Sequence, residues 1–206
     1  MTRIQDRPLA EDELEPDPLE QFAAWFDEAR RGQAVEADAM ALATATPDGE
    51  PSVRIVLMKE FDERGITFFT NYGSRKAVEL EGNPRAALLF HWPELGRQVR
   101  IEGRVRRSER ARSVAYAHSR SRASQLSALA SPQSRPVPSR EWLEERVAAL
   151  DREHARGELP VSEEWGGYRL EPVAWEFWQH RPNRLHDRFR YERSRAGSWV
   201  VERLGP

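Results

Sequence analysis

The sequence contains no cysteine, almost no lysine and no long apolar run. Without cysteine, disulfides, thiolate metal sites and cysteine nucleophiles are excluded. No segment has the roughly 20 consecutive apolar residues that a membrane-spanning helix needs, and residues 1–6 contain no apolar stretch of the signal-peptide type. We therefore expect a cytoplasmic protein with no membrane partner.

Charged residues make up 32% of the chain, but acidic and basic side chains nearly balance, at a net charge of −2. This balance is not typical of nucleic-acid-binding modules, so we expect no nucleic-acid partner. Of the 32 basic residues, all but Lys59 and Lys76 are arginine. Because a compact ammonium and a planar guanidinium bind differently, the two lysines are candidate site residues, with chance placement as the alternative.

The N-terminal residues differ from the rest of the chain in composition and hydrophobic periodicity. Residues 1–16 are polar and acidic and show no periodicity, so we expect a flexible arm followed by one domain over residues 17–206. Asp17-Pro18 supplies an N-cap and a first-turn proline. Apolar residues at helical spacing after it predict a helix over residues 18–31.

Short strands separated by turns fill most of the remaining sequence. Three of them with short turns between predict an antiparallel meander, at residues 40–46, 52–60 and 66–70. Further strand patterns cover residues 86–91, 98–106, 168–170, 173–179, 185–192 and 198–204. Helical patterns cover residues 75–81, 109–131 and 139–155, the second of them interrupted by a Ser/Arg cluster from Ser119 to Ser124. Eight or nine short strands with peripheral helices predict a mainly β, antiparallel barrel. There is no GxGxxG motif after a strand and no P-loop.

A candidate anion site lies at the start of the helix predicted for residues 75–81. Ser74 is a suitable N-cap, and Arg75 and Lys76 follow it in the first turn. Cations there oppose the helix dipole, whereas free backbone N–H groups favour a phosphate. A bound phosphate would resolve this placement; the alternative is that both side chains extend into solvent.

A second cationic group occurs near the C-terminus. Arg184, His186 and Arg188 alternate with Leu185 and Phe189. An extended segment would place the three cation-capable side chains on one face and the two apolar ones toward a core. Such a face favours an anionic or electron-rich ligand, and a solvated edge strand is the alternative.

Several short motifs, none of them specific alone, occur in an order and spacing that resembles the pyridoxamine 5′-phosphate oxidase family. They are Arg54–Lys59, Phe69–Asn71, Gly73–Lys76, Arg97–Val99, Ser131–Ser134, Trp165–Tyr168, Glu176–Trp178 and Arg184–Phe189. The resemblance extends from about Asp17 to Pro206. It implies a split antiparallel β-barrel that forms a homodimer, with FMN bound in clefts shared by the two subunits.

The resemblance also implies an activity and its residues. The reaction would be oxidation of a phosphorylated pyridine, pyridoxamine or pyridoxine 5′-phosphate, to pyridoxal 5′-phosphate, with O2 as acceptor and H2O2 as product. The implied cofactor residues are Arg54, Ile55, Val56, Leu57, Met58, Lys59, Phe69, Thr70, Arg75, Lys76, Gln98, Gln133, Ser134, Trp178 and Arg188, with Arg54, Arg75 and Lys76 at the phosphate. The implied substrate residues are Lys59, Tyr116, Arg120 and Ser124 at the substrate phosphate and the catalytic pair Arg184 and His186 at the pyridine ring. No metal is implied.

Residue spacing bears on two parts of this set. Tyr116, Arg120 and Ser124 are four residues apart, so a continuous helix would place them on one face as a phosphate cradle. Arg54 and Lys59 have opposite parity, so an ideal strand would point them to opposite faces. A bulge, a bend at the strand end, or positions on different sides of the cofactor would each reconcile them.

Two alternatives remain open at this point. The first is a related FMN oxidase that acts on another aromatic compound, such as a phenazine precursor. The second is a non-catalytic split barrel that binds flavin or haem. The short N-terminal arm is assigned no residue that closes over substrate, and His180 is interpreted as a loop histidine.

Overall fold

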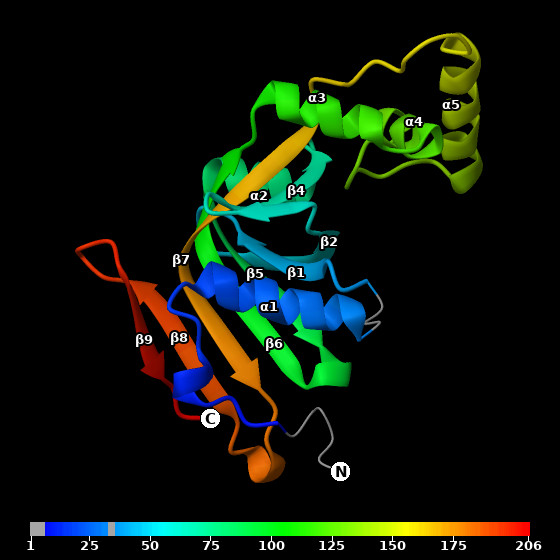
Figure 1. Ribbon diagram of the computed structural model, residues 1–206. Helices are drawn as coiled ribbons and strands as arrows, with labels where there is room; N and C mark the ends of the chain where they lie inside the picture. Colours follow the sequence, from blue (N-terminus) through cyan, green and yellow to red (C-terminus); the bar gives the residue numbers. More distant parts are fainter. Residues whose placement is uncertain (1–6, 33–35) are drawn as a thin grey trace.

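The computed structural model describes residues 7–32 and 36–206, which form a strongly curved antiparallel sheet with peripheral helices (Figure 1). The described strands are β1 (Ala39–Ala45), β2 (Pro51–Leu57), β3 (Glu60–Asp62), β4 (Gly65–Asn71), β5 (Arg85–Trp92), β6 (Arg97–Arg107), β7 (Trp165–Gln179), β8 (Asp187–Arg193) and β9 (Trp199–Arg203). Their order is β2-β1-β5-β6-β7-β4-β3, and β8 pairs with β7 and β9. The prediction of a mainly β, antiparallel split barrel is confirmed.

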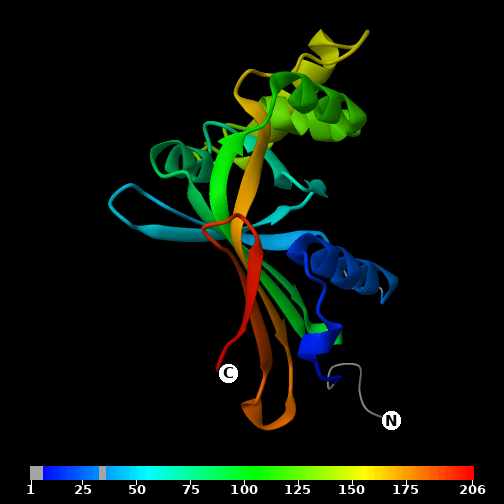
Figure 2. The ribbon, with the colours of Figure 1, turned by 60° about the vertical axis from the view of Figure 1, so that its left-hand side comes forward.

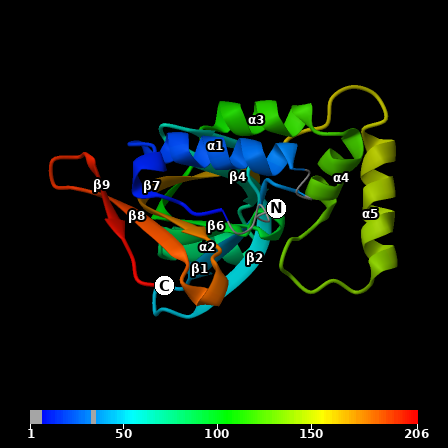
Figure 3. The same cartoon turned by 60° about the horizontal axis from the view of Figure 1, so that its bottom comes forward.

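The helices lie around this sheet. They are α1 (Pro18–Arg31), α2 (Arg75–Gly82), α3 (Arg110–Ser119), α4 (Arg122–Ala130) and α5 (Arg140–Glu153), with 3-10 turns η2 (Glu11–Glu13), η3 (Pro93–Leu95) and η4 (Pro182–Arg184). α4 and α5 lie at one end of the molecule and the β8–β9 hairpin at the other (Figures 1 and 3). No helix of the described chain is long and apolar enough to cross a membrane.

Helix α1 closes one face of the sheet, and its predicted start is confirmed. Asp17 Oδ1 accepts a hydrogen bond from Leu19 N at 2.9 Å, as an N-cap does. Phe22 is fully buried, with ring centroids 5.0 Å from Phe90 and 5.5 Å from Trp175. The 3–4 residue spacing of the buried side chains therefore builds an aromatic core between α1 and the curved sheet.

Strand β7 connects the two ends of the molecule (Figures 1 and 2). One edge pairs with β6 along most of its 15 residues, while the other pairs with β4 near its start and with β8 near its end. Pro172, which has no N–H to donate, lies where the partner changes. A register shift between Glu102 and Gly103 faces this point, where a Cβ on Gly103 would lie 2.2 Å from the Glu171 carbonyl oxygen. The two strands predicted at 168–170 and 173–179 are thus one strand.

The three-strand meander predicted for residues 40–70 is wrong. β1 and β2 form a hairpin, but β3 and β4 form a separate one, and β4 pairs with β7. Between the hairpins the Met58 side chain turns into the core at 4% exposure, and Lys59 N donates to Thr67 O at 2.9 Å. This turn ends β2 at Leu57 and redirects the chain to the far edge of the sheet.

The described part of the N-terminal arm contacts the C-terminal strands. Leu9 is buried and its N–H donates to Asp187 Oδ2 at 3.2 Å, while the Tyr191 hydroxyl donates to Glu15 O at 2.8 Å. Residues 1–6 lie outside the described residues. A flexible arm and a domain boundary at residue 17 stay predictions.

Truncation of the buried aromatic core should destabilise the protein. Phe22→Ala removes a ring from five aromatic neighbours, so we expect the free energy of unfolding to fall by about 3–5 kcal/mol. Denaturant unfolding at fixed protein concentration measures it. Val78→Ala, at a side chain 63% exposed, is the control and should change it by less than about 0.5 kcal/mol. A loss for Phe22→Ala below about 1 kcal/mol would contradict this account of the core.

Candidate functional site

A cavity of about 720 Å³ between β2, β4 and the α3–α4 helices, called here the Lys76 cavity, contains most of the predicted site residues. The predicted residues that line it are Arg54, Ile55, Val56, Leu57, Lys59, Phe69, Thr70, Lys76, Tyr116, Arg120, Ser124 and Gln133. Segments far apart in sequence therefore meet here within one chain. Six predicted cofactor residues do not line it: the buried Met58, the exposed Arg75 and Ser134, and Gln98, Trp178 and Arg188, which lie elsewhere on the sheet.

Lys76 is a buried ammonium with neutral partners. Its side chain is 8% exposed, and Nζ donates to Thr70 Oγ1 at 3.1 Å, Ser74 Oγ at 3.3 Å and Gln133 Oε1 at 2.9 Å. Burial, and then the positive charge of Arg54, lower the pKa of Lys76 to about 8. A cation held under these conditions favours a bound anion, because an anion offsets both causes of the lowered pKa.

Two arginines near Lys76 share one buried carboxylate. Arg54 Nη1 donates to Thr44 Oγ1 at 2.6 Å, and its Nη2 lies 3.4 Å from Glu79 Oε2. Arg75 Nε lies 2.8 Å from Glu79 Oε1, and the Glu79 side chain is 3% exposed. Sequence reasoning missed Glu79, although its i, i+4 spacing from Arg75 was a signal of their pairing.

Three stacked aromatic rings form another part of the cavity. The Phe69 ring centroid lies 4.0 Å from Tyr116 and 5.5 Å from Trp165, with the planes within 19° of each other. The Arg120 guanidinium lies 5.2 Å from the Trp165 ring centroid. The motif Trp165–Tyr168 includes Trp165, but the sequence did not predict that its ring lines this cavity. Flat aromatic ligands suit such a surface.

The parity problem of Arg54 and Lys59 is resolved by a bend. Because β2 ends at Leu57 and the chain turns at Met58, both side chains line the same cavity. Lys59 Nζ lies 3.0 Å from Asp38 Oδ2. A phosphate ligand of Lys59 would therefore compete with the Asp38 carboxylate.

The interruption predicted within residues 109–131 is confirmed, so Tyr116, Arg120 and Ser124 do not lie on one continuous helix. α3 ends at Ser119, Arg120 is extended at φ −79° and ψ 157°, and α4 begins after Ser121. Ser121 Oγ caps α4 by accepting from Ser124 N at 3.3 Å. The three side chains still line one cavity, because the corner between the helices turns them toward it.

A second group of predicted residues lies near the opposite end of β7, called here the Trp178 cluster: Gln98, Trp178, Arg184, His186 and Arg188. Gln98 on β6 and Arg188 on β8 are the register partners of Trp178, and the His186 ring lies 4.4 Å from the Trp178 ring. None of the five lines the Lys76 cavity. Trp165 and Trp178 are 13 residues apart on one strand, about 40 Å along its path. One chain thus holds the two groups apart.

The face predicted for Arg184, His186 and Arg188 is also wrong. Arg184 ends the turn η4 with a left-handed φ of 64°, and β8 begins only at Asp187. Leu185 is 69% exposed rather than in the core, whereas Phe189 is fully buried as expected. A left-handed non-glycine residue costs on the order of 1 kcal/mol, and such strain is typical of functional sites.

His186 is held as a neutral imidazole. Its Nδ1 accepts a hydrogen bond from Arg181 N at 3.2 Å, so the neutral ring carries its proton on Nε2. Burial, followed by the charges of His180, Arg184 and Arg188, lowers the pKa of His186. His180, interpreted from sequence as a loop residue, has its ring centroid 5.4 Å from that of His186.

Arg188 is anchored by a buried carboxylate that sequence reasoning passed over. Its Nε and Nη2 each lie 2.9 Å from Glu176 Oε1, and Arg100 Nη2 lies 2.7 Å from Glu176 Oε2. Glu176 is 6% exposed. The pair fixes the Arg188 guanidinium beside Trp178.

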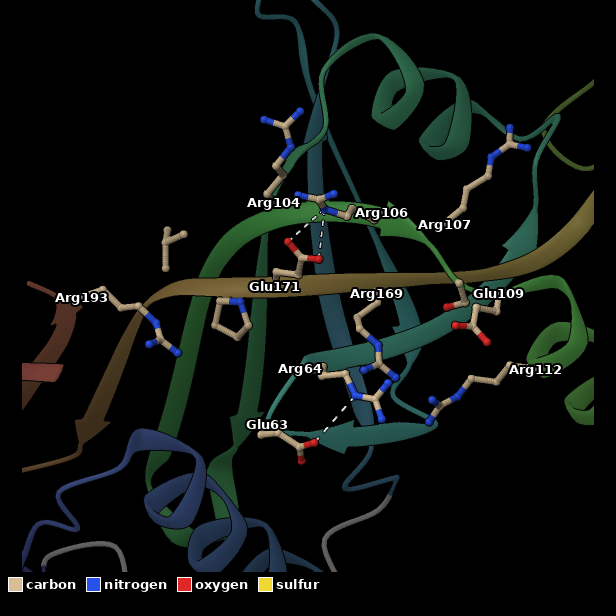
Figure 4. Close-up of a pocket in the computed structure, with 13 residues that line it drawn as sticks. Glu63, Arg64, Arg104, Arg106, Arg107, Glu109, Arg112, Arg169, Glu171 and Arg193 are labelled. Carbon is tan, nitrogen blue, oxygen red and sulfur yellow. Dashed lines mark hydrogen bonds and ion pairs between the residues drawn. The ribbon is translucent and has the colours of Figure 1, made fainter. Parts of the chain in front are cut away.

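Another cavity, of about 650 Å³, is lined by many arginines (Figure 4), but its charges are largely compensated. Arg106 pairs with Glu171 at 3.0 Å and Arg169 with Asp62 at 2.9 Å. Arg64, Arg107 and Arg112 also have carboxylate partners. The Lys76 cavity, with a buried ammonium on neutral acceptors, is therefore the better candidate anion site.

Comparison with known proteins gives full-length matches. Residues 26–152 match the family model described as pyridoxamine 5′-phosphate oxidase, and residues 165–206 match the pyridoxine 5′-phosphate oxidase C-terminal dimerisation region. The pyridoxine/pyridoxamine 5′-phosphate oxidase of Rubrobacter xylanophilus is 56% identical over 96% of this chain and 91% of that protein. The protein of the same name from Salinibacter ruber is 54% identical over 96% of this chain and 93% of that protein.

Solved structures agree on the fold. PhzG from Burkholderia lata, in complex with tetrahydrophenazine-1-carboxylic acid, has a TM-score of 0.92 at 34% identity, covering 98% of this chain and 100% of that chain. A pyridoxamine 5′-phosphate oxidase-related, FMN binding protein from Nostoc punctiforme has a TM-score of 0.72 at 22% identity, covering 92% and 98%. At that identity the second likeness bears on the fold alone.

The lowered pKa of Lys76 gives a pH-dependent prediction. An anionic phosphate binds the protonated ammonium, so FMN affinity of the cofactor-free protein should fall as pH rises through about 8, by up to about tenfold per pH unit. Flavin fluorescence titrations between about pH 7 and 9 measure it, with riboflavin, which lacks the phosphate, as control. An FMN affinity as insensitive to pH as that of riboflavin would contradict this site.

Proposed function

The chain belongs to the pyridoxamine 5′-phosphate oxidase family, and from that premise we propose that it oxidises pyridoxamine and pyridoxine 5′-phosphate to pyridoxal 5′-phosphate. FMN is the proposed cofactor, with O2 as electron acceptor and H2O2 as product. The observation that carries the proposal is the Lys76 cavity, in which a buried ammonium on neutral acceptors adjoins three stacked aromatic rings. That chemistry suits a phosphorylated, flat ligand.

The residues of the cavity fit the phosphate of FMN. Lys76 and Arg54 line the cavity, and the exposed Arg75, which shares Glu79 with Arg54, adds a third positive charge. The ammonium of Lys76 gains most from an anion because burial lowers its pKa. Thr70 and Gln133 accept hydrogen bonds from Lys76 in the ligand-free protein and therefore lie next to its ammonium. Residues 54–57 of β2 and Phe69 are the proposed neighbours of the flavin ring.

The substrate phosphate is assigned to the corner between α3 and α4. Tyr116, Arg120 and Ser124 supply a phenol, a guanidinium and a hydroxyl there, and Lys59 approaches from the end of β2. Lys59 now pairs with Asp38, so substrate binding exchanges one anion for another at its ammonium.

The complete site requires two copies of the chain, because the Lys76 cavity and the Trp178 cluster lie at opposite ends of β7. We propose a homodimer in which the second copy supplies Gln98, Trp178, Arg184, His186 and Arg188. The match of residues 165–206 to a dimerisation region supports this arrangement. The outward face of β2 adds an apolar surface for the partner, with Val53, Ile55 and Leu57 exposed at 68%, 65% and 38%.

FMN, when bound, would supply the redox chemistry, namely acceptance of a hydride from the substrate carbon that bears the amine or alcohol. The chain supplies position and charge. The guanidinium of Arg184 would stack on the pyridine ring of the substrate and hold it for the reaction. His186, neutral with its proton on Nε2, donates a hydrogen bond to the ring hydroxyl oxygen and orients the substrate.

A related oxidase acting on a phenazine precursor is the alternative function, favoured by the TM-score of 0.92 with PhzG. Sequence identity ranks it lower, at 34% against 54–56% for the two pyridoxine/pyridoxamine 5′-phosphate oxidases. The phosphate-binding groups of Tyr116, Arg120 and Ser124 also favour a phosphorylated substrate.

Flavin reduction tests the activity. The FMN-loaded protein mixed with pyridoxine 5′-phosphate under nitrogen should lose its yellow colour, and air should restore it. Arg184→Ala should slow this bleaching by at least about tenfold, because the ring is no longer held, and should keep FMN affinity within about twofold. A wild-type protein that stays yellow would contradict the activity, and normal bleaching by Arg184→Ala would contradict the role of Arg184.

Mixed dimers test the shared site. A copy with Lys76→Ala and a copy with Arg188→Ala, coexpressed with different tags and purified as the mixed dimer, combine both changes in one site and leave the other intact. The mixed dimer should show about half of wild-type activity. A mixed dimer of Lys76→Ala and Arg54→Ala has one change in each site and should stay inactive. Equal activity of the two mixed dimers would contradict the arrangement.

A further inference from the structure

We propose that Glu79 is a positioning residue, which holds the guanidinium groups of Arg54 and Arg75 in the arrangement that binds the cofactor phosphate. The inference rests on the proposed function, because it takes that phosphate as the ligand of the two arginines. Glu79 acts through the arginines and is not itself a ligand. Neither the family motifs nor the residues they imply include it.

Both oxygens of the Glu79 carboxylate are used. Oε1 accepts from Arg75 Nε at 2.8 Å. Oε2 accepts from Ser52 Oγ at 2.6 Å and from Thr44 Oγ1, and lies 3.4 Å from Arg54 Nη2. One side chain on α2 thereby joins donors from β1, β2 and its own helix, at 3% exposure.

The orientation of Arg54 follows from this network. Its Nη1 donates to Thr44 Oγ1 and to Leu42 O at 3.1 Å, so one edge of the guanidinium faces the Glu79 side of the sheet. Within residues 7–32 and 36–206, Arg75 is held by Nε alone, which leaves its two terminal nitrogens for another anion. A phosphate placed between the two arginines would meet guanidinium groups that are already fixed in orientation.

Glu79 stays ionised over the whole working range of pH. Burial on its own would raise the pKa of Glu79, but hydrogen bonds from Ser52, Thr44 and Arg75, with the charge of Arg54, lower it to about 2. The pKa is thus set by the donors that the carboxylate holds. A buried carboxylate this close to an anion site repels the anion. Its placement therefore indicates a compensating benefit, which is that the two guanidinium groups are held in fixed orientations.

The charges also balance. Arg54, Arg75 and Lys76 carry three positive charges and Glu79 one negative charge, so the group has a net charge of +2, equal and opposite to a phosphate monoester dianion. Glu79 offsets part of the charge of Arg54, which, after burial, is the second cause that lowers the pKa of Lys76.

Glu79→Gln separates this role from packing, because the amide has nearly the same shape. An amide offers one oxygen and one NH2 group, so one of the two arginine contacts meets a donor instead of an acceptor. Glu81→Gln is the matched control: Glu81 lies on the same helix and holds Arg107 at 2.8 Å and the Tyr168 hydroxyl at 2.6 Å, outside the phosphate group.

The experiment titrates cofactor-free protein with FMN and with riboflavin. Glu79→Gln should lower FMN affinity about tenfold, the scale of one lost charge-assisted hydrogen bond, and leave riboflavin affinity unchanged. The pH midpoint of FMN binding should also move below about 8, because Lys76 loses a compensating charge. Glu81→Gln should leave the FMN-to-riboflavin ratio and the midpoint at their wild-type values.

Glu79→Asp keeps the charge but shortens the reach, and it carries the test if the glutamine variant does not fold. It should keep the pH midpoint near 8 and lose part of the preference for FMN. An equal loss for both flavins, or no change in the ratio, would overturn the positioning role. A wild-type protein with no preference for FMN over riboflavin would instead overturn the phosphate site and, with it, the proposed function.

Discussion

The pairing of β7 with three other strands is the constraint on which the site depends. Because β6 runs along one edge while β4 and β8 share the other, the strand cannot fold back on itself, and its two ends stay apart. The Lys76 cavity lies at one end and the Trp178 cluster at the other. In the proposed site, which combines both groups, a second copy of the chain is therefore required, and dimerisation becomes a condition of that function.

Burial of like charges is the second constraint. Lys76 is desolvated among neutral acceptors beside Arg54, and Glu79 is the buried carboxylate that compensates part of this charge. The ligand-free protein carries this unfavourable arrangement because α2 is anchored by Leu80 and Ala77 in the core, which fixes the side chains before any ligand arrives. Such preorganisation lowers the cost of ordering on binding, so an anion gains the full benefit of the three cations.

Local pattern predicted the elements of the fold, but not their partners. The spacing of Phe22 and Phe26 predicted α1. Alternating residues predicted most strands, with bounds within a few positions of those observed. The pairing of β4 with β7 depends on residues about 100 positions away, and the turn at Met58 depends on a buried side chain, so neither follows from a local pattern. The extended conformation expected at Arg184 was wrong for a related reason. The turn imposes a left-handed backbone there, which breaks the alternation of side chains around it.

Motif order predicted which side chains share a cavity better than residue spacing did. Tyr116, Arg120 and Ser124 line the Lys76 cavity together although α3 and α4 are separate helices, because the cavity requires only that the side chains converge. Glu79 shows the opposite case. Glu79 follows Arg75 by four residues, which is the pattern of an ordinary surface ion pair on a helix, and such a pair contributes little net stabilisation. Burial changes that estimate: the same carboxylate, removed from water and bound by Ser52 and Thr44 as well, becomes the group that sets where two cations point.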